Sequence, residues 1–254
     1  MLQPWVQGFI IKVLDETAAT RRFFFQISSM ERFDFVPGQF VTLDLPIHEQ
    51  KNKRWRSYSI ASAPNGTNTF ELVIVKLEGG KGTSWLWENG HVGSEITLRG
   101  AMGKFVLPEI IDRDLYLICT GTGIAPFRSM VHHIKNHHIP HKNIYLVFGT
   151  RVISDLLYPG EMQGLHEEMD SFNYIPVCSR EPADNPQGIV TGYVHDAYEA
   201  VIKSKPFQPQ DEGPDLPPPA YFFLCGWKNM IDEARQRLQT LGYDKKSVHF
   251  ELYG

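Results

Sequence analysis

The chain has 254 residues, of which 42% are hydrophobic and 21% charged, and its net charge is −4 at pH 7. This composition is typical of a globular protein with room for two modest domains, and the slight acidity gives no reason to expect nucleic-acid binding. No apolar run approaches the roughly 20 residues of a membrane-spanning helix, and the N-terminus lacks a signal-peptide pattern, so we expect a soluble, cytoplasmic protein without a membrane partner.

The first half of the chain, from Trp5 to about Leu107, has the pattern of short strands separated by Gly, Pro and Asn. This spacing predicts an antiparallel barrel or sandwich, with one short helix at Thr83–Glu88. The expected strands are FIIKVLDET, RRFFFQISS, GQFVTLDLP, RSYSIASAP, TFELVIVKL and EITLRGAMG.

The second half alternates buried-strand runs with helical stretches, the first helix being expected at Pro126–His138. This alternation predicts βαβ units on a parallel sheet. The expected strands are DLYLICT, NIYLVFG, YIPVC, YFFLCG and a terminal SVHFELYG. We therefore predict two domains, an antiparallel β-barrel over residues 1–108 and an α/β domain over 109–254. The Pro-rich stretch Lys205–Pro219 is predicted to be a loop within the second domain.

The expected strand RSYSIAS carries Arg56, Tyr58 and Ser59, which we interpret as sharing one strand face. An aromatic ring between a cation and a hydroxyl suits a planar anionic cofactor. The ring stacks, the guanidinium binds phosphate and the hydroxyl can hydrogen-bond a ring nitrogen. The alternative is an ordinary half-buried strand aromatic.

A glycine-rich segment, Gly79–Ser84, stands just before the short expected helix. Such a turn offers free backbone N–H groups and the positive end of the helix dipole, which together form an anion site. The alternative is an ordinary turn in which Thr83 or Ser84 caps the helix.

A second glycine-rich segment, CTGTGIAPF at residues 119–127, follows an expected strand and opens a helix, which is the context of dinucleotide binding. It departs from the common GxGxxG pattern because Pro126 replaces the third Gly, and no acid about 20 positions later is placed to hold a ribose hydroxyl. Arg151 and Arg180 instead follow the next two strands. Arginine there favours a 2′-phosphate, hence NADP(H) over NAD(H); the alternative is solvated loop arginines.

The last two expected strands also carry candidate site residues. Cys225 ends the fourth strand of the second half, and ligands of open α/β sheets bind outside the carboxyl ends of the strands. Cys225 would therefore face the nicotinamide, although a buried cysteine can equally serve as a small hydrophobe. Glu251 and Tyr253 share one face of the terminal strand.

The spacing of cysteine and histidine does not predict a metal site. The three cysteines, Cys119, Cys178 and Cys225, form no CxxC pair and no zinc or iron–sulfur pattern, which is typical of a reducing compartment. His133 and His137 would share a helix face and could form a metal pair. No Asp, Glu or Cys completes a coordination shell nearby, so we predict no metal.

Taken in order, these segments resemble the ferredoxin–NADP(+) reductase family, in its bacterial ferredoxin/flavodoxin reductase form. RSYSIAS looks like the family's RxYS flavin signature, GKGTS like its flavin-phosphate segment and GTGIAPF like its nicotinamide-nucleotide motif. The CG at 225–226 and the final ELY look like its two late motifs. The likeness runs from about Phe9 to Tyr253, and it implies a FAD-binding β-barrel followed by an NADP(H)-binding α/β domain. Gly254 departs from plant-type members, which stop at the aromatic residue.

The resemblance also implies roles for single residues. Arg56 would bind the flavin pyrophosphate, Tyr58 would stack on the flavin ring, and Ser59 would lie near its N5 atom. Tyr253 would cover the opposite flavin face, and Glu251 would lie near the flavin edge. The implied FAD-binding residues are Arg56, Ser57, Tyr58, Ser59, Gly82, Thr83, Ser84, Thr122 and Tyr253. The implied NADP(H)-binding residues are Gly121, Thr122, Gly123, Pro126, Arg151, Ser179, Arg180 and Cys225. The expected catalytic residues are Ser59, Cys225, Glu251 and Tyr253.

The function implied is hydride transfer between NADP(H) and FAD, with single electrons exchanged with ferredoxin or flavodoxin. The basic loop KNKR at 51–54 is a candidate dock for such an acidic partner, and a solvated loop is the alternative. A monomer is favoured. Two other functions stay open, the NADH-dependent reductase component of an oxygenase and a non-catalytic flavin-binding module. The residues also leave FMN open beside FAD.

Overall fold

The computed structural model describes residues 3–185, 189–209 and 215–253. The chain divides into two compact units. The first consists of the residues up to Leu107 together with Ala125–Ile139, and the second consists of Pro108–Ile124 together with the residues from Pro140 onward. Each unit contains one six-stranded sheet.

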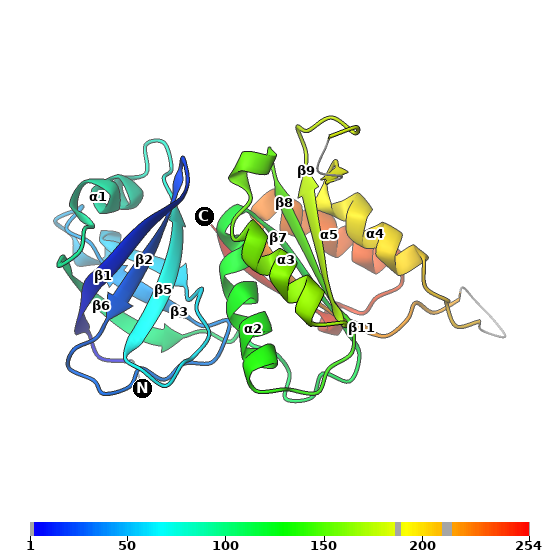
Figure 1. Ribbon diagram of the computed structural model, residues 1–254, viewed down its shortest axis with the longest axis horizontal. Coiled ribbons are helices and arrows are strands. Elements are labelled where there is room, and N and C mark those ends of the chain that lie inside the picture. Colours follow the sequence, from blue (N-terminus) through cyan, green and yellow to red (C-terminus); the bar gives the residue numbers. More distant parts are fainter. Residues whose placement is uncertain (1–2, 186–188, 210–214, 254) are drawn as a thin grey trace. The chain divides into compact units, whose positions relative to one another are not determined.

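The first sheet is antiparallel, with the strand order β4-β3-β6-β1-β2-β5 (Figure 1). Its strands are β1 (Val6–Thr17), β2 (Thr20–Gln26), β3 (Phe40–Asp44), β4 (Trp55–Ser59), β5 (Thr69–Val75) and β6 (Glu95–Met102). Ile60, just after β4, forms a bridge with Leu72 of β5, the strand at the other edge. The two edges therefore meet, and the sheet closes into the predicted barrel.

The barrel forms because apolar residues at alternate positions of its strands point inward. The inward residues Phe23, Phe25, Val41, Leu43, Leu72 and Leu98 are fully buried. Helix α1 (Lys81–Asn89) adds Leu86 to this core. The helix predicted at Thr83–Glu88 thus lies within α1, which begins two residues earlier.

The second sheet is parallel, with the order β10-β9-β8-β7-β11-β12. Its strands are β7 (Asp114–Thr120), β8 (Ile144–Thr150), β9 (Phe172–Cys178), β10 (Val190–Thr191), β11 (Ala220–Trp227) and β12 (Val248–Tyr253). Figure 1 shows α3 (Pro159–Glu168) on one face, and α4 (Val194–Lys203) and α5 (Lys228–Thr240) on the other. The predicted fold class, a β-barrel plus a parallel α/β sheet, is confirmed.

Three details differ from the sequence expectations. Helix α2 (Ile124–Asn136) groups with the first unit, although it follows the first strand of the second sheet. The two-residue strand β10 was not predicted. Within the predicted loop Lys205–Pro219, Gln208 and Leu216 form a bridge, and residues 210–214 lie outside the described residues. No helix among the described residues is long and apolar enough to cross a membrane.

Candidate active site

Strand β4 places Arg56 and Tyr58 on one face of the barrel wall. In the register with β3, Arg56 lies opposite Leu43 and Tyr58 opposite Val41. Side chains of a strand alternate between its two faces, so Ser59 falls on the other face. The interpretation that Ser59 shares the face of Tyr58 was wrong, because one residue separates them and the strand period is two. Ser57 hydrogen-bonds Thr42 on that other face, with their hydroxyl oxygens 3.0 Å apart.

Tyr58 is half-buried and packs against the barrel core. Burial raises the pKa of its phenol to about 12, and the nearby Arg56 cation opposes that rise. The phenol is therefore neutral at every physiological pH, and its ring offers an uncharged flat surface.

The two predicted flavin segments come together where Gly82 meets Arg56. A Cβ atom on Gly82 would lie only 2.9 Å from Cγ and 3.2 Å from Nε of Arg56. The first turn of α1 therefore packs directly on the arginine side chain, which only glycine permits. Arg56 Nη1 also donates to the carbonyls of Lys53 at 3.1 Å and Trp55 at 2.7 Å. A fixed guanidinium beside a helix N-terminus forms a cradle for phosphate.

The hydroxyl of Thr83 closes the turn before α1. Its Oγ1 accepts a hydrogen bond from the Leu77 amide and donates to the Gly80 carbonyl, both at 3.1 Å. The residue before the helix is Gly80, and no side chain caps it. Thr83 and Ser84 are therefore not the N-cap considered as an alternative, because the helix already begins at Lys81. With the Thr83 hydroxyl occupied in these two bonds, the groups that this helix N-terminus can offer to an anion are backbone N–H groups.

The turn Gly121–Gly123 packs against the carboxyl end of β11. A Cβ atom on Gly123 would lie 2.2 Å from the carbonyl oxygen of Cys225, and one on Gly226 would lie 2.4 Å from Oγ1 of Thr120. Gly121 has a φ of 53°. Glycine is therefore required at 123 and 226 by the close approach of the two segments. Half-buried Thr122 lies mid-turn, and Pro126 lies in the first turn of α2.

Cys225 is fully buried beside Cys119, its register partner on β7. On the other side it pairs with Glu251 of β12, and Trp227 pairs with Tyr253. Burial raises the pKa of the Cys225 thiol well above its usual range, Glu251 adds to the rise, and a hydrogen bond with Tyr253 partly opposes it. Cys225 is therefore a neutral thiol rather than a nucleophilic thiolate. Gly254 lies outside the described residues.

Two arginines lie side by side beyond β8 and β9. The amide of Ser179 donates to the Thr150 carbonyl at 3.1 Å, and the amide of Arg180 donates to the Arg151 carbonyl at 2.8 Å. Both arginine side chains are exposed. Within the described part of the chain, neither guanidinium forms an ion pair with a carboxylate. Arg151, Ser179 and Arg180 thus lie close together just beyond the carboxyl ends of the neighbouring strands β8 and β9.

Two family models match the two halves of the chain. Residues 9–107 match the oxidoreductase FAD-binding domain, and residues 117–236 match the oxidoreductase NAD-binding domain. The chain belongs to the ferredoxin–NADP(+) reductase family. The family resemblance inferred from the motifs is confirmed, as are domains for FAD and a nicotinamide nucleotide.

Several known proteins of this family are similar over nearly the whole chain. The glycine betaine monooxygenase reductase subunit of Chromohalobacter salexigens is 26% identical over 257 residues, which is 99% of this chain and 66% of that protein. Ferredoxin–NADP reductase B of Sorangium cellulosum is 29% identical over 237 residues, covering 92% of this chain and 91% of that one. The crystal structure of an Amycolatopsis cytochrome P450 reductase superposes with a TM-score of 0.82 at 25% identity, covering 98% and 70%.

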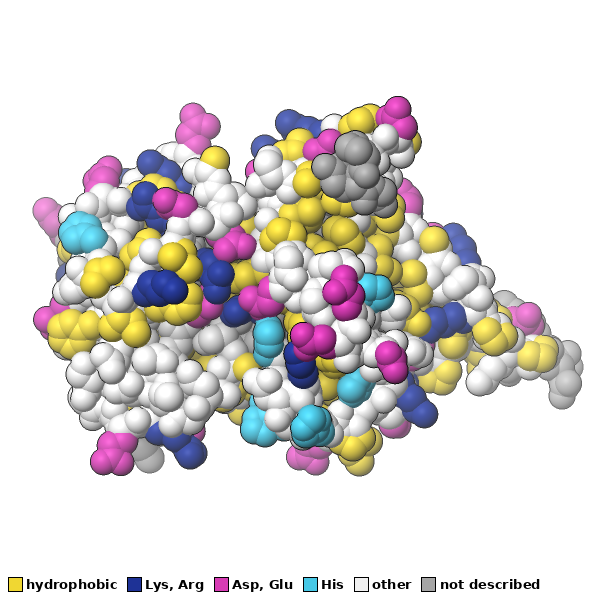
Figure 2. All heavy atoms as spheres, viewed as in Figure 1, with side chains coloured by type: hydrophobic (Ala, Val, Ile, Leu, Met, Phe, Trp, Pro, Cys, Tyr) yellow, Lys and Arg dark blue, Asp and Glu magenta, His cyan; other side chains and the backbone are white. Residues whose placement is uncertain are grey.

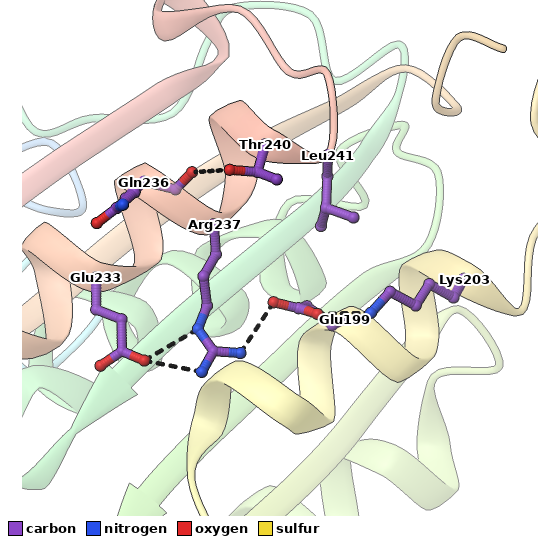
Figure 3. Close-up of a pocket in the computed structure, with 7 residues that line it drawn as sticks. All are labelled: Glu199, Lys203, Glu233, Gln236, Arg237, Thr240 and Leu241. Atoms are coloured by element: carbon purple, nitrogen blue, oxygen red, sulfur yellow. Dashed lines mark hydrogen bonds and ion pairs between the residues drawn. The ribbon is translucent and has the colours of Figure 1, made fainter. Parts of the chain in front are cut away.

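A cavity of about 510 Å³ lies away from the family's motifs, between α4 and α5 (Figure 3). Its lining residues are Glu199, Lys203, Glu233, Gln236, Arg237, Thr240 and Leu241. Arg237 pairs with Glu199 at 3.1 Å and with Glu233 at 2.9 Å, and Lys203 also pairs with Glu199. These charges satisfy one another, so the cavity does not point to a bound charge.

Histidine side chains gather on the surface around the C-terminal part of α2 (Figure 2). The rings of His133 and His137 have centroids 4.4 Å apart, and burial together with His137 lowers the pKa of His133. Among the described residues, no group of three or more His, Cys, Asp or Glu could hold a metal ion.

A buried charge cluster in the first unit, centred on Glu71, was not predicted from the sequence. The Glu71 side chain is only 3% exposed, and it pairs with Arg22 at 2.6 Å and Arg128 at 3.1 Å. The available signal was a single acid inside the apolar run TFELVIV. A carboxylate is rarely buried without partners, so that position already implied a nearby cation.

Proposed function

We propose that the protein is a flavoenzyme that transfers a hydride between NADP(H) and FAD and exchanges single electrons with ferredoxin or flavodoxin. The observation that carries the proposal is the pair of glycine-dependent contacts, Gly82 on Arg56 and Gly123 on Cys225. Each contact packs a glycine-rich turn tightly against a neighbouring segment, one within the FAD-binding domain and one within the NAD-binding domain. Such a turn at the start of a helix offers backbone N–H groups to a phosphate.

The first cradle fits FAD. Bound FAD would supply the group that accepts or donates the hydride. Arg56 and the N-terminus of α1 bind the pyrophosphate, and Tyr58 stacks its neutral ring on the flavin. Thr83 keeps the turn closed through its bonds to Leu77 and Gly80, so its side chain supports the cradle indirectly.

The second cradle binds the nicotinamide nucleotide. The N–H groups of Gly121–Gly123 and the N-terminus of α2 hold the pyrophosphate. The neutral Cys225 thiol borders the nicotinamide without adding charge, so the positive oxidised ring is not paired with a thiolate. Arg180, with Ser179 and Arg151, binds the 2′-phosphate, which makes NADP(H) the preferred nucleotide.

The test begins with flavin identification in the purified protein, with FAD expected and FMN as the contradicting result. NADPH and NADH are then added anaerobically in turn, and loss of the oxidised-flavin absorbance is followed. Faster reduction by NADPH supports the proposal, and no reduction by either nucleotide points to a non-catalytic flavin module. Preference for NADH favours the alternative function, a reductase component of an oxygenase. The similarity to the glycine betaine monooxygenase reductase subunit, of which this chain spans 66%, supports that alternative.

The loop over 51–54 is the candidate dock for the acidic redox partner. Lys51 and Lys53 are exposed, whereas Arg54 is bound to Asp44 at 2.7 Å. We therefore expect the double variant Lys51→Ala, Lys53→Ala to weaken flavodoxin binding about threefold to tenfold at low salt, and much less at high salt. Equal binding by variant and wild type at low salt contradicts the docking role.

A further inference from the structure

Helix α2 is held in the first unit by side chains that do not belong to the proposed nucleotide site. The ring centroids of Phe127 and Phe105 lie 5.9 Å apart. Ser129, fully buried, donates from Oγ to the carbonyl of Ser62 at 2.7 Å. These contacts explain why α2 groups with the barrel rather than with the sheet that precedes it in sequence.

Arg128 adds a charged contact between α2 and the barrel. Its Nη1 donates to the carbonyl of Ala61 at 2.9 Å and to Oε2 of Glu71 at 3.1 Å. The side chains of Arg128 and Glu71 are only 11% and 3% exposed. Charge-assisted hydrogen bonds shielded from water are strong and directional. The position of α2 on the barrel is therefore sharply defined at this point.

Glu71 is held from its other side by Arg22, which does not lie on α2. Arg22 donates from Nε to Oε1 at 2.6 Å and from Nη2 to Oε2 at 3.2 Å. Arg22 also pairs with Glu16 at 3.4 Å. The Glu71 carboxylate thus pairs with one cation on helix α2 and one on strand β2. Removing each cation in turn therefore compares the loss of a bond to α2 with the loss of a bond inside the barrel.

The carbonyl groups that accept hydrogen bonds from α2 belong to residues directly after the proposed flavin strand. Ala61 and Ser62 follow Ser59 and Ile60 in sequence. The Ala61 amide donates to the Glu71 carbonyl at 2.8 Å, and the Glu71 amide donates to Oγ of Ser62 at 3.0 Å. At its other end, α2 begins at Ile124, immediately after the turn Gly121–Gly123. Helix α2 therefore follows the nucleotide-binding turn in sequence, and within the first unit it is hydrogen-bonded to the residues that follow the strand carrying Arg56 and Tyr58.

We propose that Arg128 is a positioning residue for hydride transfer. Through Ala61 and Glu71 it fixes helix α2, which follows the nucleotide-binding turn in sequence, on the continuation of the flavin strand within the first unit. The inference rests on the proposed function. Hydride transfer requires the reacting atoms about 3–3.5 Å apart, and a displacement of about 1 Å can cost about 100-fold in rate. Loosening α2 should therefore slow the reaction more than it weakens nucleotide binding.

The test compares Arg128→Met with Arg22→Met, because each removes one cation from Glu71, and Arg128 lies on α2 whereas Arg22 lies on β2. Anaerobic stopped-flow measurements give the limiting rate of flavin reduction and the apparent Kd for NADPH. Arg128→Met should lower the limiting rate about 10- to 100-fold and change Kd by less than about threefold. Arg22→Met should lower the Tm as much as Arg128→Met does, but leave the limiting rate within about twofold of the wild-type rate.

Arg128→Lys, which keeps the charge, should recover part of the limiting rate. Equal slowing by the two Met variants, or no slowing by either, overturns the proposal.

Hydrogen exchange provides a readout that does not depend on activity. Arg128→Met should accelerate amide exchange in α2 and in the turn before it, whereas Arg22→Met should accelerate it in β2 and β5. If neither NADPH nor NADH reduces the wild-type flavin, the proposed function fails. The exchange data still test whether Arg128 holds helix α2 in place. Unchanged exchange in α2 of Arg128→Met then overturns the role of Arg128.

Discussion

At the scale of single residues, the proposed preference for NADPH over NADH rests on Arg151 and Arg180, exposed cations that have no carboxylate partner among the described residues. We expect Arg180→Ala to lower kcat/KM for NADPH about 10- to 100-fold, because a hydrogen bond between charged groups contributes about 1.5–3 kcal/mol. The value for NADH should change little, since that nucleotide has no 2′-phosphate. Steady-state kinetics with both nucleotides measure the change.

The control for this prediction is Arg32→Ala. Arg32 is also a surface arginine, 60% exposed, but it pairs with Asp34 within the barrel unit. Its removal should leave both values unchanged. An equal loss for NADPH and NADH in Arg180→Ala would show that Arg180 supports the loop rather than selecting the phosphate.

At the scale of structural elements, we expect alanine substitution of two glycines in the second unit to change the free energy of unfolding in opposite directions. Gly123→Ala places a methyl group 2.2 Å from the carbonyl of Cys225, so the turn before α2 must shift. A Cβ on Gly164, inside α3, meets nothing within 4 Å. Gly164→Ala should raise the free energy of unfolding by up to about 1 kcal/mol. Gly123→Ala should lower it by about 1–3 kcal/mol and weaken nucleotide binding.

Denaturant unfolding and nucleotide titration of both variants distinguish a steric effect from a general effect of alanine. Nucleotide binding should be normal in Gly164→Ala. If Gly123→Ala binds NADPH as tightly as the wild type, the turn does not need its close approach to β11.

The sequence predicted elements well wherever one local pattern determines them. Apolar alternation located the barrel strands, and a strand followed by GTG located the turn before α2. Contacts between segments that are distant in sequence could not be predicted. The residues around Gly82 and those around Arg56 contain no pattern indicating that the two are in contact. The same holds for Arg128, whose partners come from two other segments. Ser59 differs from these cases, because the strand period of two already places its side chain on the face opposite that of Tyr58.

At the scale of the whole molecule, buried histidines make stability depend on pH. His195 is only 4% exposed, and burial lowers its pKa from 6.5, while Glu233 opposes that shift. Partial burial likewise lowers the pKa of His133, and the neighbouring His137 adds to that shift. The unfolded chain therefore binds more protons than the folded one once the pH falls below the unfolded value of about 6.5. The stabilisation is fully present above that pH and is lost as the pH falls through the folded pKa values.

We therefore expect the free energy of unfolding to decrease from about pH 7 to about pH 5, with urea unfolding as the measurement. His195→Gln removes one titrating group, so its unfolding free energy should depend less steeply on pH, whatever packing it loses at neutral pH. His91→Gln, at an exposed position, is the matched control and should keep the wild-type slope. The slope separates the two effects, because lost packing shifts the whole curve whereas lost titration flattens it. A wild-type slope in His195→Gln would mean that the acid sensitivity arises elsewhere in the molecule.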